Sequence, residues 1–407
     1  MINLLSFLQK SSFTKNIIKS FVGQSSFVLF TMVFTLVCTR LYGVDVFGQY
    51  TFGFSIITIL MILASSGLDN GLMYYMPKVS NKYVSFSFLM NFIFSMIIII
   101  IVFFIVDKPI IHYMLPLVWL VSMENLFFGL YRATNNISKF FMMYGFLAFL
   151  IRIGLVVLFY YYFDGSVSFI LISVYISFII SNIVYFIQNK KRFGKIYVDF
   201  TFLKYSFPLV LAGFTTILIY RVDVVMLGFM TNNASVGIYQ ITMQIANVVG
   251  FVILIFNTAF APKISELFHE NKKLELKNLY IKSTRILALV ALIISVFLIS
   301  GSELILLAFG EEVTQGQTTL ILRVAAQFFT LAVGSVWFML SMTGDSKSQM
   351  IINLFAAIIN IALNFLLIPM YGIEGAAIAS MISIILMSLI GYFLVRNKFQ
   401  IKVFKFF

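Results

Sequence analysis

Charged residues are scarce in this chain of 407 residues: they make up only 11% of it, whereas hydrophobic residues make up 61%. A water-soluble domain usually carries about 25% charged residues. No soluble core can absorb so much apolar surface, so the composition excludes a water-soluble protein. It predicts a chain that crosses a membrane several times.

Cysteine and histidine are nearly absent. Cys38 is the only cysteine, which excludes an intrachain disulfide, and His112 and His269 are too few and too scattered to bind a metal ion. The sequence also lacks the GxxxxGK(S/T) pattern of a phosphate-binding loop, so we expect no ATPase in this chain. We therefore predict no cofactor and no metal. The short outer loops argue against an enzyme that acts on substrates outside the membrane.

Long apolar runs are what the chain has in abundance. A helix needs roughly 20 apolar residues to cross a hydrocarbon core of ~30 Å, and in runs of this length only helices satisfy the backbone polar groups. The ninth run is the least regular, because Gly301, Ser302 and Glu303 interrupt it. About twelve such runs lie near residues 21–40, 47–68, 84–106, 110–131, 140–162, 166–187, 206–230, 236–260, 285–309, 317–342, 349–370 and 373–395.

Basic residues concentrate on one side of the predicted membrane. The chain has 28 Lys and Arg against 15 Asp and Glu, a net charge of +13. If the N-terminus is cytoplasmic, 23 of the 28 basic residues fall in inward loops or at the two ends. This is the positive-inside rule, and it predicts that both termini are cytoplasmic. Since topology explains the positive charge, we do not expect nucleic acid as a partner.

The polar stretch QNKKRFGKIYVDF (188–200) divides the spans into six and six. Two motifs recur in each half: GQY and PKVS flank the second span, and GIY and PKIS flank the eighth. An even number of spans gives both halves the same orientation, as in transporters that rock two bundles about a central site. We predict an N-terminal six-helix lobe (1–187), a cytoplasmic linker (188–204) and a C-terminal six-helix lobe (205–407).

Residues 262–285 differ from the spans around them. Their charges are mixed, and their apolar side chains recur at helical spacing. This pattern predicts an amphipathic helix on the cytoplasmic surface, with its lysines near anionic headgroups. Docking of a partner protein is the alternative role for this segment.

Three segments resemble a known family. They are TRLYGVDVFGQYTFGFSIITILMILASSGL (39–68), VDVVMLGFMTNNASVGIYQ (222–240) and NIALNFLLIPMYGIEGAAIAS (360–380), and the last is the most specific. They resemble the Wzx-type polysaccharide or O-antigen flippases of the multidrug/oligosaccharidyl-lipid/polysaccharide exporter superfamily. The resemblance covers nearly the whole chain. It implies an all-α membrane protein of about twelve transmembrane helices, in two lobes with MATE-like pseudo-two-fold symmetry.

The resemblance also implies a function and partners. Such proteins flip undecaprenyl-pyrophosphate-linked oligosaccharide repeat units, for O-antigen, capsule or a related polysaccharide, across the bacterial cytoplasmic (inner) membrane. The implied partners are this lipid-linked oligosaccharide, membrane lipids, and a polysaccharide polymerase and chain-length regulator. A multidrug/cation antiporter of the same architecture remains an alternative, and a membrane glycan polymerase or ligase is another.

A charged residue inside a span costs roughly 2.5–3.5 kcal/mol unless it has a partner or an aqueous cavity, and five such residues are candidates for a functional role. Arg152, Arg221 and Arg323 are candidate cavity residues, because a guanidinium binds phosphate oxygens in a bidentate fork. Glu124 is another candidate cavity residue, although a structural Glu124–Arg152 bridge is the alternative for that pair.

Residues two apart on a helix, such as Arg221 and Asp223, point about 200° away from each other. We therefore expect Asp223 to pair with Arg323 while Arg221 faces the cavity, the alternative being that Arg221 is bound to a neighbouring helix. Asp223 is the candidate carrier of a coupling ion, with Glu124 as a second.

Three asparagines fall on one stripe of the eleventh predicted span: Asn353, Asn360 and Asn364. Amide side chains within a membrane commonly hydrogen-bond across helices. We predict such interhelical bonds here, with sugar contact as the alternative.

Overall fold

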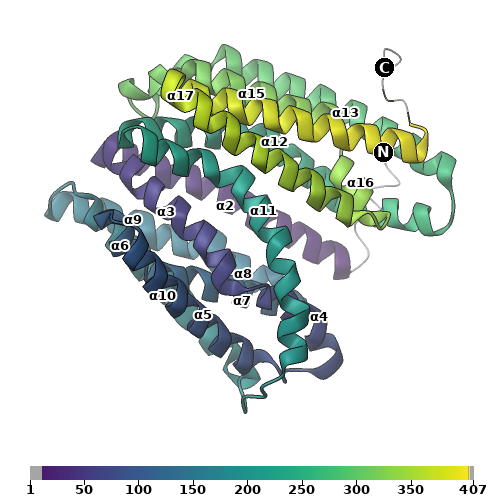
Figure 1. Cartoon of the computed structure of the whole chain (residues 1–407), viewed down its shortest axis with the longest axis horizontal. Helices are drawn as coiled ribbons and strands as arrows, with labels where there is room; N and C mark the ends of the chain where they lie inside the picture. The colour runs from purple at the N-terminus through teal and green to yellow at the C-terminus, as the bar shows by residue number, and fades with distance from the viewer. Residues whose placement is uncertain (1–11, 402, 404–407) are drawn as a thin grey trace. The chain divides into compact units, whose positions relative to one another are not determined.

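The structure, a computed structural model, describes residues 12–401 and residue 403 (Figure 1). These residues form helices joined by turns, with no strand among them. The predicted all-α fold is confirmed. The predicted cytoplasmic placement of Lys10, Lys402 and Lys405 falls on residues outside the described ranges.

Two compact units make up the chain, Met1–Ile217 and Leu218–Phe407. The border lies inside helix α11 (Phe200–Met230), whose first part therefore belongs to the N-terminal unit. Before α11 come α2 (Ser12–Tyr42), α3 (Val44–Ser65), α4 (Leu68–Val79), α5 (Val84–Ile105), α6 (Pro109–Met114), α7 (Leu117–Ala133), α8 (Ile137–Met142), the π-helical η1 (Met143–Leu147), α9 (Ala148–Tyr162), α10 (Val167–Asn189) and the 3-10 turn η2 (Lys190–Arg192). After it come α12 (Asn233–His269), α13 (Lys273–Ser300), α14 (Ser302–Leu307), the 3-10 turn η3 (Glu311–Gly316), α15 (Gln317–Ala332), α16 (Val336–Met342) and α17 (Ser346–Phe399).

Long apolar helices account for the predicted spans. Among the described residues, ten helices are long and apolar enough to cross a membrane, and the pair Glu311–Ala332 and Val336–Met342, bent by 41°, makes up to eleven. One of the ten, Lys347–Phe399, contains both of the last two predicted spans. Its backbone leaves the helical region at Gly372, where φ is 56° and ψ is −127°, so two spans meet there. The prediction of about twelve spanning helices is confirmed.

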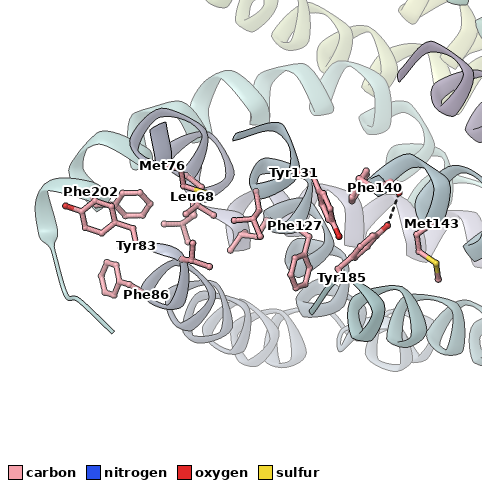
Figure 2. Close-up of a cluster of buried hydrophobic side chains, with 14 of the residues drawn as sticks. Leu68, Met76, Tyr83, Phe86, Phe127, Tyr131, Phe140, Met143, Tyr185 and Phe202 are labelled. Carbon is pink, nitrogen blue, oxygen red and sulfur yellow. Dashed lines mark hydrogen bonds between the residues drawn. The ribbon is translucent and has the colours of Figure 1, made fainter. Parts of the chain in front are cut away.

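The second span of the N-terminal unit is broken between α3 and α4. Ser66 and Gly67 both have positive φ, 47° and 68°. A Cβ on Gly67 would overlap the backbone carbonyl oxygen of Ser206, and a Cβ on Gly71 would overlap the Ser206 hydroxyl. The first part of α11 therefore packs directly against α4, and it inserts Phe202 into the aromatic core of this unit (Figure 2).

Aromatic side chains dominate that core. Tyr185 stacks on Phe140 with ring centroids 5.1 Å apart, and Tyr83 stacks on Phe202 at 4.7 Å. Between helices in a bilayer such contacts stabilise through van der Waals packing, because lipid tails are as apolar as the side chains themselves. The aromatic core therefore fixes how α4, α7, α10 and α11 fit together.

The connection between α10 and α11 is hydrogen-bonded to the turn that precedes α5 and to the first turn of α5. Arg192 Nη1 donates to Asn81 Oδ1 at 3.5 Å, and the Gly194 amide donates to Ser85 Oγ at 2.9 Å. These contacts place two of the basic loops, near Lys82 and near Lys195, on the same side of the N-terminal unit.

Residues 262–285 do not form the predicted single amphipathic helix, and that prediction is wrong. The segment is shared between the end of α12 and the start of α13, with Asn271 in a left-handed conformation (φ 56°) between them. The apolar residues at helical spacing belong to two helices: Ile264 and Leu267 of α12 and Leu276 of α13 are all buried in one hydrophobic cluster of the C-terminal unit.

Candidate functional site

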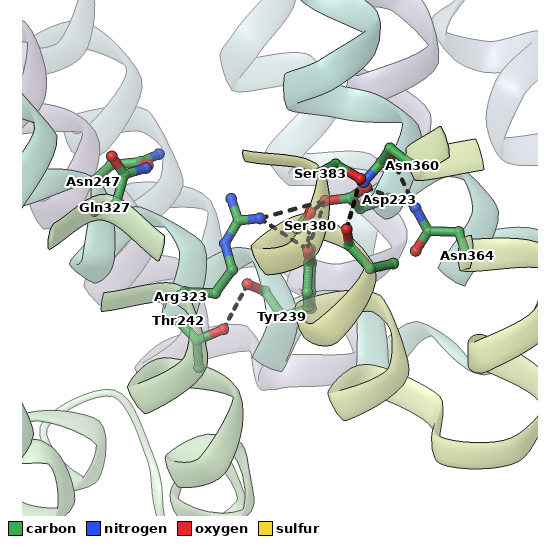
Figure 3. A network of polar contacts seen from close by, with 11 residues as sticks. Asp223, Tyr239, Thr242, Asn247, Arg323, Gln327, Asn360, Asn364, Ser380 and Ser383 are labelled. Atoms are coloured by element: carbon green, nitrogen blue, oxygen red, sulfur yellow. Dashed lines mark hydrogen bonds and ion pairs between the residues drawn. The ribbon is translucent and has the colours of Figure 1, made fainter. Parts of the chain in front are cut away.

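A buried polar cluster surrounds Asp223 of α11 inside the C-terminal unit (Figure 3). The Tyr239 hydroxyl of α12 donates to Asp223 Oδ2 at 2.7 Å, and Arg323 Nη1 of α15 lies 3.5 Å from the same oxygen. From α17, the Ser380 hydroxyl also donates to Oδ2, and Asn364 Nδ2 donates to Oδ1 at 2.9 Å. Side chains of three other helices thus converge on the carboxylate of α11.

Because the cluster is buried, each of its charged side chains depends on its partner. The side chains of Asp223 and Arg323 are 1% and 2% exposed, so water screens their interaction little. Removing one partner of such a pair leaves an uncompensated buried charge, which typically costs roughly 3–5 kcal/mol. The carboxylate already has four hydrogen-bond donors within the protein, one of which is the Arg323 cation, so it is satisfied without an external ion.

The predicted pairing of Asp223 with Arg323 is confirmed by this contact. Arg221, two residues earlier on α11, is partly exposed, whereas Asp223 is buried. The two side chains therefore have different surroundings, as their spacing on the helix requires. The predicted interhelical role of the asparagine stripe is confirmed for Asn364, which links α17 to α11 and also donates to Asn360 Oδ1 at 3.0 Å.

Sequence reasoning did not single out Tyr239 and Ser380. Ser380 is a single hydroxyl in an apolar run, where a serine commonly bonds to its own helix backbone, and Tyr239 is one of 20 tyrosines in the chain. A signal was present, because Tyr239 is the tyrosine of the GIY motif, and its counterpart Tyr50 in GQY is also buried, at 5% exposure. A tyrosine that recurs in both halves of an apolar chain is a candidate for a buried hydroxyl contact.

The buried polar cluster is followed by further polar side chains on α12 and α15 (Figure 3). Gln327, one turn beyond Arg323, donates Nε2 to Asn247 Oδ1 at 2.9 Å. Gly250 leaves room for this amide, since a Cβ there would lie 2.8 Å from Gln327 Oε1. Arg323 Nε is buried and has no hydrogen-bond partner among the described residues. The guanidinium therefore retains one unused donor.

Arg152 is the buried cation of the N-terminal unit, at 6% exposure. Its Nε donates to Ser177 Oγ of α10 at 3.0 Å. Its guanidinium carbon lies 4.8 Å, 4.9 Å and 5.6 Å from the ring centroids of Phe149, Phe178 and Phe34. Desolvated cation–π contacts contribute up to about 2 kcal/mol. The ion pairs of the described residues include none for Arg152, whose charge interacts with the rings, the Ser177 hydroxyl and, at longer range, the Glu124 carboxyl group.

Glu124 of α7 is the buried acid of the same unit, at 4% exposure. The Glu124–Arg152 bridge, the alternative considered from the sequence, is absent from the ion pairs of the described residues. Helix α10 packs against both α7 and α9, and the Glu124 carboxyl group interacts with Arg152 only at longer range and with Tyr185 of α10. Glu124 Oε1 has no hydrogen-bond partner in the described part of the chain.

Comparison with known families gives two matches. Residues 13–268 match the family described as "Polysaccharide biosynthesis protein", and residues 208–366 match the family MatE. A curated relative is the capsular polysaccharide biosynthesis protein CapF of Staphylococcus aureus, 28% identical over 152 residues. That alignment spans 37% of this chain and 38% of the relative, less than half of either.

Solved structures share the fold. The lipid II flippase MurJ in an inward closed conformation superposes with a TM-score of 0.75 at 16% identity, over 94% of this chain and 89% of that one. An inward-facing multidrug resistance MATE family transporter of the MOP superfamily superposes with a TM-score of 0.70 at 11% identity, over 93% and 98%. A MOP superfamily transporter from Pyrococcus furiosus, titled for the reverse polarity of its binding pocket, gives 0.64 at 14% identity, over 97% of both chains. At these identities the likeness establishes the fold.

Proposed function

The chain belongs to the polysaccharide biosynthesis protein family, a membrane transporter family of the MOP superfamily, and from this premise we propose that it flips undecaprenyl-pyrophosphate-linked oligosaccharide repeat units across a membrane. The family match confirms the resemblance seen in the sequence. The cargo would be a precursor of O-antigen, capsule or a related polysaccharide. The protein moves this cargo by alternating access of its two lobes and performs no chemistry on it.

Within the structure, Arg152 is the observation that supports an anionic cargo. It is a buried guanidinium in a membrane-spanning helix, and no ion pair of the described residues neutralises it. Because a buried charge without a counter-ion is costly, an anionic cargo would be stabilised by Arg152 and would offset that cost while it is bound. The pyrophosphate of the carrier lipid is a dianion or more, and a guanidinium binds phosphate oxygens through two parallel hydrogen bonds.

The other two arginines have different proposed roles. Arg323 stabilises the C-terminal unit through Asp223, so it contributes to the site by positioning α11 and α15. Arg221 is partly exposed and lies on the other side of α11 from Asp223. We assign Arg221 the direct contact with the pyrophosphate as the cargo approaches the outer leaflet.

The proposed location is the bacterial cytoplasmic (inner) membrane, with both termini in the cytoplasm. The excess of Lys and Arg in alternate loops supports this orientation. The contacts between Arg192 and Asn81 are consistent with it, because they join two loops that the charge pattern assigns to the same side. A polysaccharide polymerase and a chain-length regulator would then receive the flipped units at the outer leaflet.

If transport is coupled to an ion, Glu124 is a better carrier than Asp223. Asp223 accepts hydrogen bonds from four side chains, including an arginine, and has little capacity left for a proton or sodium ion. Glu124 is buried, and its Oε1 has no partner among the described residues. One elementary charge moved across 100 mV supplies ~2.3 kcal/mol. The same buried acid is the observation that favours the second candidate function, a multidrug/cation antiporter.

Deletion of the gene tests the proposed function. A flippase-deficient strain should accumulate lipid-linked oligosaccharide in the inner leaflet and lose the surface polysaccharide, and the wild-type gene should restore both. Normal surface polysaccharide in the deletion strain, combined with greater sensitivity to cationic drugs, would contradict the flippase and support the antiporter.

A further inference from the structure

Two exposed tyrosines and a lysine form a cluster at one end of the N-terminal unit. Tyr74 of α4 and Tyr205 of α11 stack with ring centroids 4.3 Å apart and an angle of 19° between the rings. Lys78, one turn beyond Tyr74, places Nζ 3.6 Å from the centroid of the Tyr74 ring. Tyr74 is 41% exposed and Tyr205 37% exposed; because Tyr205 and Lys78 cover the two faces of the Tyr74 ring, the accessible parts are the edge of Tyr74 and the far face of Tyr205. We refer to Tyr74, Lys78 and Tyr205 as the tyrosine–lysine platform.

The backbone beneath the platform is held in place. Gly71 of α4 lies so close to Ser206 of α11 that a Cβ would overlap the Ser206 hydroxyl, which brings the two helices into direct contact. Tyr75 then packs edge-on against both Tyr74 and Tyr205, at 5.0 Å and 5.5 Å between ring centroids. Rings fixed in this way lose little conformational entropy when a ligand binds, which favours affinity.

The charge of the platform is not neutralised by an ion pair within the part of the chain that the structure describes. Lys78 belongs to the PKVS motif, and its counterpart in PKIS, Lys263, forms an ion pair with Glu266 at 2.5 Å. The ion pairs of the described residues include none for Lys78. Lys204, next to Tyr205 in sequence, is exposed as well. The two equivalent lysines thus differ, and only Lys78 presents its charge on an aromatic surface.

We propose that the tyrosine–lysine platform binds a sugar attached to a phosphate group, as the loading site for the headgroup of the lipid-linked cargo. Lys78 contacts the phosphate oxygens, and the free face of the Tyr205 ring, which Tyr74 supports from behind, contacts the apolar face of the first sugar ring. This inference rests on the proposed function and adds to it the residues that first recognise the substrate. A simple phosphate headgroup of a membrane lipid would use the lysine alone, whereas a sugar phosphate also uses the stacked rings. The basic loops beside the platform are those predicted to be cytoplasmic, where lipid-linked repeat units are loaded.

Binding by the full chain in nanodiscs of zwitterionic lipid tests the platform. Two probes are compared: a short-chain polyprenyl-pyrophosphoryl-N-acetylglucosamine and the same polyprenyl pyrophosphate without the sugar. We expect Lys78→Gln to weaken both about tenfold, the effect of one charge-assisted contact. Tyr205→Leu or Tyr74→Leu should weaken only the probe with the sugar, by about three- to tenfold. Lys263→Gln and Tyr162→Leu, which change a paired lysine and an exposed tyrosine elsewhere, are the matched controls and should bind normally.

Three results would overturn the platform. If wild-type protein binds the sugar probe and the three variants bind it equally well, the platform is wrong while the proposed function stands. If Lys78→Gln weakens association with phosphatidylglycerol vesicles as much as it weakens the sugar probe, and the tyrosine variants bind normally, the cluster is a membrane-surface anchor. If wild-type protein binds neither probe and does not flip the sugar probe, the proposed function fails and the platform fails with it. Unchanged thermal midpoints of the variants show that a loss of binding is not a loss of fold.

Discussion

At the scale of single residues, the two buried arginines of this protein are stabilised in different ways. Arg323 has a carboxylate within 3.5 Å and the Tyr239 hydroxyl at 3.3 Å. Arg152 has a serine hydroxyl and three phenylalanine rings. A guanidinium with a permanent counter-ion stabilises the fold, and one without it remains available to an anion. The sequence alone could not separate the two, because both appear as an arginine in an apolar run.

The Asp223–Arg323 pair gives the first prediction. Asp223→Asn or Arg323→Met alone should destabilise the protein by roughly 3–5 kcal/mol, because each leaves one charge buried without a partner. The double variant should recover part of that loss, because it leaves neither charge. Thermal unfolding in detergent would measure the three variants. Fully additive losses in the double variant would show that the two side chains do not stabilise each other.

Arg152 and Glu124 give the second prediction. Because they do not bridge, their substitutions should have separate effects. Arg152→Ala should reduce export of polysaccharide at least tenfold with near-normal protein abundance, whereas Glu124→Gln should preserve abundance and change only the dependence of export on the ion gradient. Immunoblots of membranes and surface polysaccharide measurements would follow both. A parallel fall in the abundance of both variants would indicate a shared structural role instead.

At the scale of helices, the spans could be predicted from the sequence and their breaks could not. Length and apolar character fix where a helix can cross a bilayer, and these properties are local. The break at Ser66 and Gly67 follows from the close approach of Ser206, which lies far away in sequence. The amphipathic pattern of 262–285 was misread for the same reason: the partners of its apolar residues lie in α16 and α17, so the pattern reflects burial within the protein. The Asp223–Arg323 contact could be predicted, because the two residues lie at similar depths in two antiparallel predicted spans.

The connection to α11 gives a prediction that depends on pH. The side chains of Thr201 and Tyr83 donate hydrogen bonds to Asp199 and hold its pKa at about 2, below its usual 3.8. When folding lowers the pKa of a carboxyl group, its ionised form stabilises the folded state, and this stabilisation is complete above the pKa of the unfolded state. It is lost as the pH falls through the lower pKa of the folded state. Docking of the connection should therefore persist down to about pH 4 and be lost between about pH 4 and pH 2.

A spin label would measure this docking. Placed by Lys195→Cys in a Cys38→Ser background, the label should keep the same mobility from pH 7 to about pH 4 and become more mobile below it. Asp199→Ala should show the mobile signal at every pH, whereas Thr201→Val should give an intermediate signal. A transition centred above pH 5, or a wild-type signal in Asp199→Ala, would refute the role of Asp199.

At the scale of the whole molecule, the two units carry polar interiors of different kinds. The C-terminal unit encloses a charge-balanced cluster in which the Asp223 carboxylate has four hydrogen-bond donors. The N-terminal unit encloses Arg152 and Glu124, which are not paired with each other.

The topology of the chain is the prediction that belongs to this scale. Both ends and the connection near Lys195 should face the cytoplasm, because basic residues are retained there during insertion. An alkaline phosphatase reporter after Lys195 should be inactive, and the same reporter after Asp164 should be active. Activity after Lys195 would reverse the orientation of every span.

Flipping by the purified protein tests the central claim most directly. Proteoliposomes would contain a fluorescent polyprenyl-pyrophosphoryl sugar in both leaflets, and a membrane-impermeant reductant added outside would quench the exposed label. With wild-type protein, quenching should continue from half of the label to nearly all of it, whereas Arg152→Ala protein should leave the inner half protected. Protection of the inner half by wild-type protein under every ion gradient tested would contradict the assignment of this chain as a flippase of lipid-linked oligosaccharides.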